Sequence, residues 1–321
     1  MRISVRRFVY WLVLGILTAT ILIACNSVNT TRVTNNQPQA ENCRIVKHTM
    51  GETCVPRNPQ RIIVLREDTL ANSLALGVKP IASVFASDLP LPSYLQGKID
   101  GIESVGGYEA PSIEKMLQLK PDLILGNFYY SKTIYNQLSQ IAPTVILNIP
   151  YPPPSWKEQL EELAQVLGKE DVSQKLINDY WQRIEKLKQA LGNRHSLVVS
   201  VASTSSQYGI WAYGQQHFSG TVLNDVGLQR PPAQQGDFFY VENISEEKIA
   251  DIDGDVLFFL TWEPENDKKA LEKLKQRPLW RQLEVVQRNQ VYFVGTHWHD
   301  AAYFAINMIV DDLFKYLVNT P

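Results

Sequence analysis

Aromatic side chains, together with one arginine and several histidines, directly follow the segments of this sequence that are predicted to be buried strands. Arg66 comes after the apolar run 61–65, and Tyr129 follows a second apolar run, 123–125. Ligands of open α/β sheets lie outside the carboxyl ends of the strands, so these side chains are expected to meet in a cleft. The candidate ligand-binding residues are Arg66, Tyr129, Tyr130, Tyr151, Trp211, Tyr213, Trp262, His297 and Trp298.

A cleft of this composition suits a bulky, partly apolar ligand that buries oxygen groups when it binds. Arg66 could offer a forked set of hydrogen-bond donors to such oxygens. For each single aromatic residue, the alternative is an ordinary position in the core. Arg66 and Trp262 are the preferred members of the set.

A metal site is the alternative use of the histidines. His297 and His299 would share a face if their segment stays extended, and His217, Glu67 and Asp68 could add further nitrogen and oxygen ligands. No spacing enforces that set, so we expect no metal site. The sequence also contains no G-x-S-x-G elbow and no glycine-rich phosphate loop. It therefore favours ligand binding over catalysis.

An internal repeat indicates that two related lobes position these side chains. Ser112 begins SIEKMLQLKPDLILG and Ser245 begins SEEKIADIDGDVLFF, and an ungapped alignment pairs Glu114 with Glu247. Each copy predicts a serine N-cap, a short amphipathic helix and a buried strand. Strand-like runs precede and follow both copies. The order predicts an α/β fold with two lobes, each with a mostly parallel sheet flanked by helices.

Residues 168–192 are predicted to join the lobes as a single long helix. Apolar side chains recur there in steps of three and four, and neither glycine nor proline interrupts the segment until Gly192. A helix of about 21 residues would span ~32 Å and would limit how far the lobes can separate. The expected lobes are residues 43–167 and residues 193–321.

The start of the chain has the pattern of a secretory signal. Three arginines precede the apolar run 8–24, which ends in LIAC and resembles a bacterial lipoprotein cleavage box with Cys25 as the lipidated residue. An uncleaved anchor helix is the alternative. Residues 1–24 are thus expected to be a signal peptide, and residues 25–42, which are rich in Asn and Thr, a flexible tether. The mature protein is expected in the periplasm or cell envelope, lipid-anchored to the membrane.

Two cysteines remain once Cys25 is assigned to the lipid. An even number of cysteines in an oxidising compartment permits one disulfide, between Cys43 and Cys54, which flank a predicted hairpin that turns near Met50 and Gly51. Two free thiols are the alternative. Of the 321 residues, 45% are hydrophobic and 20% charged, which excludes a disordered chain. The net charge of −2 gives no reason to expect nucleic-acid binding, and we expect a monomer.

Several stretches together resemble the iron-siderophore and cobalamin group of ABC-transporter substrate-binding lipoproteins. The resemblance runs from Cys43 to the C-terminus and includes the cleavage box. It implies the helical-backbone type of periplasmic binding protein, with two α/β lobes joined by one long helix and the ligand between them. The matching stretches are HTMGETCVPRNPQRIIVL, ALGVKPIAS, PSIEKMLQLKPDLIL, IAPTV, SGTVLNDVGLQRP and DDLFKYL.

The resemblance also implies a function. A member of this group captures a ferric siderophore and delivers it to the membrane permease, and it needs no cofactor and no enzymatic step. A catecholate site would be expected to show several converging arginines, so the single candidate Arg66 slightly favours hydroxamate types. Cobalamin or haem binding by the same fold is the alternative, ahead of bare Zn or Mn binding or an enzyme.

Glu114 and Glu247 receive a separate role from the resemblance. In this group one acidic residue on each lobe pairs with arginines on the two permease subunits. The alternative is local, because a carboxylate near the start of a helix interacts favourably with the helix dipole.

Overall fold

The structure, a computed structural model, describes residues 43–85 and 90–319. The predictions of a signal peptide, of lipidation at Cys25 and of a tether up to residue 42 lie outside the described residues. Residues Cys43–Pro321 form one compact unit. Within the described ranges, no helix is both long enough and apolar enough to cross a membrane.

The first lobe is built on a five-stranded sheet with the strand order β5-β4-β3-β6-β7, and its strand pairs are parallel. A hairpin of two further strands precedes it. The strands are β1 (Cys43–His48), β2 (Gly51–Pro56), β3 (Ile62–Val64), β4 (Ala82–Ser83), β5 (Glu103–Ser104), β6 (Leu123–Asn127) and β7 (Thr144–Leu147). The helices are α2 (Glu67–Ala75), η1 (Ser93–Leu95), α3 (Ile113–Leu119), α4 (Phe128–Ser131), η2 (Lys132–Ile134), α5 (Tyr135–Ile141) and α6 (Trp156–Leu167).

The second lobe has a mixed sheet with the order β10-β9-β8-β11-β12. Strands β8, β11 and β12 are parallel, whereas β9 is antiparallel to both of its neighbours. The short connection 206–208 can join β8 and β9 only as an antiparallel pair. The strands are β8 (Val199–Ser205), β9 (Gly209–Tyr213), β10 (Tyr240–Ile244), β11 (Val256–Leu260) and β12 (Val291–Val294).

The helical segments of the second lobe include the C-terminal helix α12, which continues directly into η7. They are η3 (Gly192–Ser196), α8 (Phe218–Val226), η4 (Pro232–Gln234), η5 (Glu246–Ile252), α9 (Glu265–Lys275), α10 (Pro278–Gln282), α11 (Glu284–Gln287), η6 (Thr296–His299), α12 (Tyr303–Leu313) and η7 (Phe314–Val318). The predicted fold class of two α/β lobes is therefore confirmed.

The aspartates at the equivalent position of the two repeat copies make the same kind of hydrogen bond. The Asp122 carboxylate accepts hydrogen bonds from the backbone N–H groups of Gln60 (2.7 Å) and Arg61 (2.9 Å), just before β3. Asp255 likewise accepts from the N–H of Val198 (2.8 Å), just before β8. Each aspartate thus ties the start of its own strand to the start of the neighbouring parallel strand.

The helices of the two copies differ. Ser112 accepts a hydrogen bond from the N–H of Lys115 and begins the α-helix α3, as expected. After Ser245 the segment η5 is a 3₁₀ helix, and the Ser245 side chain makes no capping bond. A 3₁₀ helix rises ~2.0 Å per residue rather than 1.5 Å, so the second copy spans the same number of residues over a greater length.

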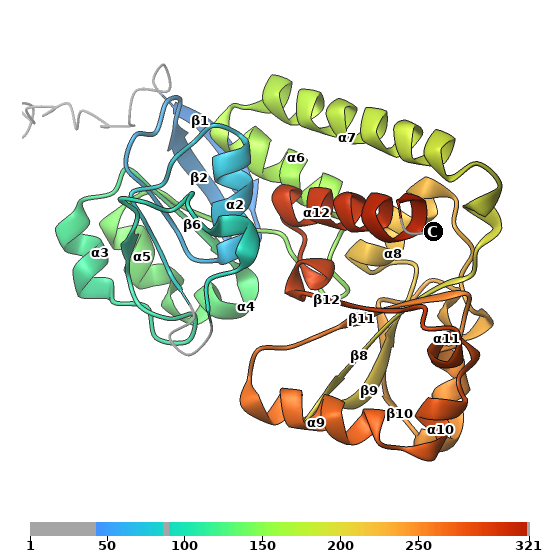
Figure 1. The fold of residues 1–321 in the computed structure, drawn as a ribbon. Helices are drawn as coiled ribbons and strands as arrows, with labels where there is room; N and C mark the ends of the chain where they lie inside the picture. The colour runs from blue at the N-terminus through green and yellow to red at the C-terminus, as the bar shows by residue number, and fades with distance from the viewer. Residues whose placement is uncertain (1–42, 86–89, 320–321) are drawn as a thin grey trace, which may run out of the picture. The chain divides into compact units, whose positions relative to one another are not determined.

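One long helix, α7 (Glu170–Leu191), runs from the first lobe to the second, as predicted (Figure 1). Polar contacts also cross between the lobes beside it. The Lys157 ammonium on α6 lies 2.6 Å from the Asp225 carboxylate on α8, and the Tyr180 hydroxyl donates to the same carboxylate at 2.7 Å. In a further contact, the backbone N–H of Tyr303, the first residue of α12, donates to the side chain of Asn72 on α2 at 2.8 Å.

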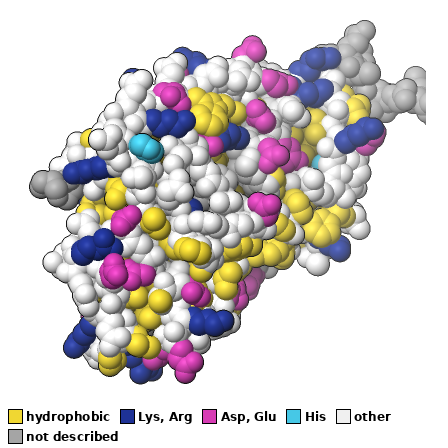
Figure 2. All heavy atoms as spheres, turned by 90° about the vertical axis from the view of Figure 1, so that its right-hand side faces the viewer, with side chains coloured by type: hydrophobic (Ala, Val, Ile, Leu, Met, Phe, Trp, Pro, Cys, Tyr) yellow, Lys and Arg dark blue, Asp and Glu magenta, His cyan; other side chains and the backbone are white. Residues whose placement is uncertain are grey.

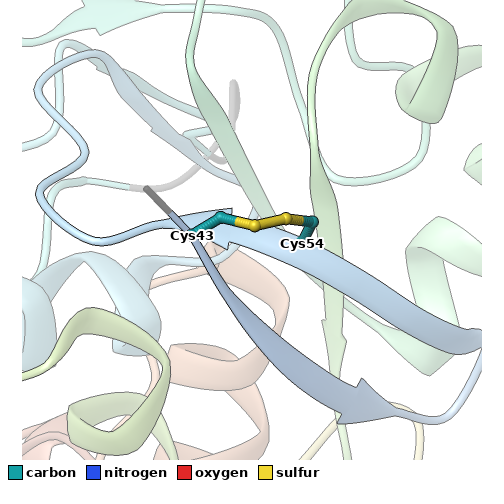
Figure 3. Close-up of a disulfide and its surroundings, with 2 residues drawn as sticks. All are labelled: Cys43 and Cys54. Carbon is teal, nitrogen blue, oxygen red and sulfur yellow. A yellow bond between two sulfur atoms is a disulfide. The ribbon is translucent and has the colours of Figure 1, made fainter. Parts of the chain in front are cut away.

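A disulfide joins Cys43 to Cys54 across the hairpin of β1 and β2 (Figure 3). Their Cα atoms are 5.5 Å apart, in the usual range for a bridge. Cys54 lies opposite Ile45 in the strand register, so the bridge crosses the ladder diagonally. The Thr53 hydroxyl donates to the carbonyl of Thr144 at 2.8 Å and fixes the hairpin on β7.

The surface carries charges of both signs. On the face shown in Figure 2, lysine and arginine side chains are interspersed with aspartate and glutamate, and hydrophobic side chains lie between them. Most of the ion pairs are exposed, such as Lys275 with Glu272 and Lys269 with Glu265, and pairs of this kind add little to stability.

Candidate functional site

A cavity of about 220 Å³ lies where the two lobes meet, and both lobes contribute to its walls. We call it the cleft cavity. Strand ends of the first lobe supply Asn127 and the segment 149–151, and the segment after β12 supplies residues 299–301. The lining residues are Arg66, Asp68, Asn127, Tyr129, Ile149, Pro150, Tyr151, Pro153, Gln159, Phe218, Phe239, Tyr240, His299, Asp300 and Ala301.

Arg66 lies just before α2 and forms a two-pronged ion pair with Asp68. Its Nε donates to Asp68 Oδ1 at 2.9 Å and its Nη2 donates to Oδ2 at 2.5 Å. Burial alone would lower the pKa of Arg66, but the Asp68 carboxylate outweighs that effect and raises it. Asp68 occupies two of the five guanidinium N–H groups, so Arg66 keeps donors for a ligand without breaking this pair.

Asp300 is the unusual acid of the cleft cavity. Burial is the largest cause that raises the pKa of its carboxyl, to about 7, and the negative charge of Asp68 acts in the same direction. A hydrogen bond from the Tyr94 hydroxyl and the charge of Arg66 only partly offset these effects. Near neutral pH, therefore, Asp300 changes its charge and with it the charge of the cavity.

Two histidines form a chain of hydrogen bonds that ends in the cavity. His217 Nδ1 caps α8 by accepting from the backbone N–H of Ser219 (3.3 Å), and it lies 2.8 Å from the Ser219 hydroxyl. His217 Nε2 is then the protonated nitrogen, and it donates to His299 Nδ1 at 3.2 Å. The remaining nitrogen of His299, Nε2, carries the proton in the neutral ring.

Both rings are held neutral. Burial is the main cause that lowers the pKa of His299, to about 4, and the nearby positive charge of Arg66 adds to the effect. Burial also lowers the pKa of His217 well below its usual value. His299 therefore offers the cavity an uncharged N–H donor whose tautomer is set by its neighbour.

Three of the predicted aromatic residues do not line the cavity. Their rings form a stacked layer beside His299. The Trp211 ring stacks on Trp262 at 5.8 Å and on Tyr213 at 6.0 Å between ring centroids. Trp211 and Tyr213 are buried, and the half-buried Trp262 donates from Nε1 to the Ser203 hydroxyl at 2.6 Å. The centroids of the Trp262 and His299 rings are 5.3 Å apart, so the stacked layer packs against the histidine.

The predicted tyrosines of the first lobe lie at the mouth of the cavity. Tyr129 and Tyr151 line it and are largely exposed, at 71% and 58%. Together with Tyr240 and Glu242 they also line an outer space of about 540 Å³, which we call the vestibule. Tyr130 stacks on Tyr108 instead, with ring centroids 5.6 Å apart.

Two predicted residues, His297 and Trp298, do not line the cleft cavity. His297 Nε2 lies 2.8 Å from Asp312 Oδ2, and Trp298 donates from Nε1 to the same oxygen at 2.8 Å. Trp298 is fully buried and stacks on Phe258. The segment forms the 3₁₀ helix η6, with three residues per turn, so positions 297 and 299 do not share a face as they would in an extended chain.

The histidines named in the metal alternative do not converge in this arrangement. His299 and His217 contact each other, whereas His297 points to Asp312. Within residues 43–85 and 90–319, no group of three or more His, Cys, Asp or Glu side chains could hold a metal ion. Glu114 and Glu247 are exposed, each as the second residue of its helix.

Several residues that line the cavity are not among the predicted ligand-binding residues. Asp300 and His299 follow β12 and satisfy the rule of strand ends, whereas the predicted ligand-binding residues from this segment are His297 and Trp298. Tyr240 begins a strand and Phe218 begins a helix, so no rule based on strand ends can select them. Asn127, the last residue of β6, could have been selected by that rule.

Comparison with known proteins identifies related chains. A family model described as periplasmic binding protein matches residues 62–296. The chain is 34% identical to the probable siderophore-binding lipoprotein YfiY of Bacillus subtilis, over 94% of this chain and 95% of that protein. It is 31% identical to the achromobactin-binding periplasmic protein of Dickeya dadantii, over 80% of this chain and 86% of that protein.

Solved structures share the fold. The structure of SirA from Staphylococcus aureus complexed with staphyloferrin B superposes with a TM-score of 0.73 at 26% identity, covering 85% of this chain and 98% of SirA.

The raised pKa of Asp300 makes stability depend on pH. The folded state holds the proton at a pKa of about 7, whereas an aspartate in an unfolded chain has a pKa of ~3.9. The folded state thus binds more protons at this carboxyl between these values, so the Asp300 contribution to the free energy of unfolding should fall as the pH rises from about 4 to about 7 and then level off, against the opposite trend from the lowered pKa values of His217 and His299. Asp300→Asn should remove this part of the fall. Urea unfolding of both proteins at a series of pH values measures it, and an unchanged slope in the variant would contradict the assignment.

Proposed function

Because this chain belongs to the periplasmic binding protein family, we propose that it captures a ferric siderophore between its lobes and delivers it to the permease of an ABC importer. The observation that carries the proposal is the cleft cavity, which joins aromatic walls to the donors of Arg66 and His299. A ferric siderophore is a bulky chelate with an apolar exterior and oxygen groups, and these walls and donors complement both. The names of the relatives support the same ligand class.

The charge of the cleft cavity favours a chelate with little negative charge. Arg66 is already paired with Asp68, His299 is neutral, and Asp300 gains a negative charge as the pH rises through about 7. A trianionic tris-catecholate complex would meet repulsion from ionised Asp300, which the Arg66–Asp68 pair does not offset because its charges cancel, whereas a hydroxamate chelate would not be repelled. A hydroxamate-type siderophore is therefore the preferred ligand. Cobalamin or haem is the second candidate, since the aromatic walls suit a planar macrocycle too.

A fluorescence titration tests the ligand class. Purified protein is titrated with iron-loaded hydroxamates, citrate-hydroxamates and catecholates, and with haem and cobalamin. Quenching is expected with a ferric hydroxamate, because Trp262 lies next to the His299 wall. Arg66→Ala should weaken binding about 10- to 100-fold, since a hydrogen bond from a charged group contributes roughly 1.5–3 kcal/mol.

The Arg66 variant needs a control, because it also leaves Asp68 without its partner. The double variant Arg66→Ala with Asp68→Asn removes the uncompensated carboxylate. Weak binding by both variants would show that Arg66 contacts the chelate. Full recovery in the double variant would show that Arg66 only neutralises Asp68, and wild-type affinity in the single variant would remove Arg66 from the site.

Docking to the permease is assigned to Glu114 and Glu247, which are exposed at equivalent positions of the two repeat copies. Rim charges mainly set orientation and association rate, so the double variant Glu114→Ala with Glu247→Ala should keep its siderophore affinity but lose most uptake of radiolabelled iron in cells. The matched control replaces two other exposed glutamates, Glu161→Ala with Glu272→Ala. Equal uptake by the docking variant at equal expression would leave the two acids with a helix-dipole role only.

Attachment to the membrane is assigned to a lipid on Cys25. Cys25→Ser should yield uncleaved or soluble protein, because the cysteine is the residue that is processed and acylated. Detergent partitioning and the mass of the mature chain measure this. A variant with the mass and partitioning of the wild type would show that the leader is not a lipoprotein signal.

A further inference from the structure

A second cavity, of about 450 Å³, adjoins the cleft cavity on the first lobe. We call it the side cavity. The short helix α4 with the following Lys132, and the loop after β7, build it; α4 follows β6, which is the parallel neighbour of β7. Its walls are Phe128, Tyr129, Lys132, Ile149, Pro150 and Tyr151, with the exposed Asn148 at one side.

The side cavity is continuous with the cleft cavity. Tyr129, Ile149, Pro150 and Tyr151 line both spaces, so a molecule in the cleft cavity lies directly against them. The charge of the walls differs between the two cavities on either side of these shared residues. The cleft cavity contains Arg66 and two carboxylates, whereas Lys132 is the one charged side chain among the described residues that line the side cavity.

Contacts within the segment 126–132 hold the aromatic side chains of α4 in place. Asn127 caps α4 by accepting a hydrogen bond from the backbone N–H of Tyr130 at 3.1 Å. A Cβ on Gly126 would lie 2.4 Å from the Ser131 hydroxyl oxygen, so glycine is needed where α4 folds back on β6. The Lys132 ammonium lies 4.7 Å from the centre of the Phe128 ring and fixes that ring further.

These side chains leave apolar surface exposed to water in the protein without ligand. Phe128 is 36% exposed, and Tyr129 and Tyr151 are exposed by more than half. Contiguous exposed apolar surface of this kind marks a binding site. The volume is about fifteen times the ~30 Å³ that a water molecule occupies in the liquid, which is room for an alkyl chain of medium length.

We propose that the side cavity binds an apolar substituent of the siderophore, an acyl or alkyl chain attached to the chelating head, so that the receptor accepts amphiphilic siderophores. The iron-binding head then occupies the cleft cavity and the chain passes over Tyr129 and Tyr151. The inference rests on the proposed function, because the chain has to be carried by a chelate that the cleft cavity holds.

The test uses one ferric trihydroxamate with a pendant amine, ferrioxamine B, in four forms: the free amine and its acetyl, hexanoyl and decanoyl amides. Dissociation constants are measured by tryptophan quenching below the critical micelle concentration. Affinity should rise with chain length by about two- to fourfold per methylene group until the side cavity is full, since burying one methylene fully gains ~0.8 kcal/mol, or about fourfold.

Phe128→Ser tests the location. Phe128 lines the side cavity and not the cleft cavity, so the variant should bind the acetyl form like the wild type and lose most of the gain from the decanoyl chain. Phe293→Ser is the matched control. Phe293 is 42% exposed and has the Lys275 ammonium 5.2 Å from its ring centre, but it lines neither cavity. This control should keep the full chain-length dependence.

The outcomes separate the two proposals. If none of the four forms binds, the proposed function fails for hydroxamates and this inference falls with it. If the acetyl form binds and the decanoyl form binds no more tightly, the inference alone is wrong. It is also wrong if Phe128→Ser leaves every affinity unchanged but lowers iron uptake, which would assign the surface to the permease. Analytical ultracentrifugation gives a last outcome. If the wild type self-associates and Phe128→Ser does not, while every affinity stays unchanged, the side cavity contacts a second copy of the chain and the inference is wrong.

Discussion

A single apolar core that runs through both lobes determines how the binding residues face one another. It contains Ile62 and Val64 of β3, Val199 and Val201 of β8, and the buried faces of α6, α7 and α12. Alternate residues of the same strands, such as Ile63 of β3 and Ala202 of β8, belong to separate clusters on the other face of each sheet. One face of each sheet therefore packs in the shared core. This packing fixes the positions of the strands and so of the loops at their ends.

This shared core limits the motion available for binding. Separating the lobes would expose the fully buried Trp156 and Tyr180, whose rings are 4.8 Å apart, and would leave the Asp225 carboxylate without Lys157. Burying an apolar side chain of this size contributes roughly 1.5–3 kcal/mol, and an unpaired half-buried charge costs more. The cleft that selects the ligand is therefore largely formed before the ligand binds. Less conformational entropy of the protein is then lost on binding.

The sequence predicted the scaffold well because its signals are local and repeated. The internal repeat, the uninterrupted pattern of α7 and the cysteine pair each depend on residues close together in the chain. The rule of strand ends placed Arg66, Tyr129 and Tyr151 on the cleft cavity for the same reason. It failed after β12, where the chain turns into a 3₁₀ helix and brings His299 rather than Trp298 to the cavity. The pairing of His217 with His299 joins residues far apart in the chain, and no spacing in the sequence reveals it.

The polar groups of the cleft satisfy one another before a ligand arrives, and this shapes selectivity. Arg66 is neutralised by Asp68, the His299 donor is uncharged, and Asp300 shares a hydrogen bond with Tyr94. A ligand gains from donors that remain after these pairs are made, and it need not supply a large opposite charge. Burial of apolar surface then has to provide most of the affinity, because few charged groups are left to do so. The exposed rings of Tyr129, Tyr151 and Phe128 provide that surface beside the polar floor. The nearly neutral floor of the cleft thus follows from the Arg66–Asp68 pair and the uncharged His299, and the exposed rings beside it form the aromatic rim.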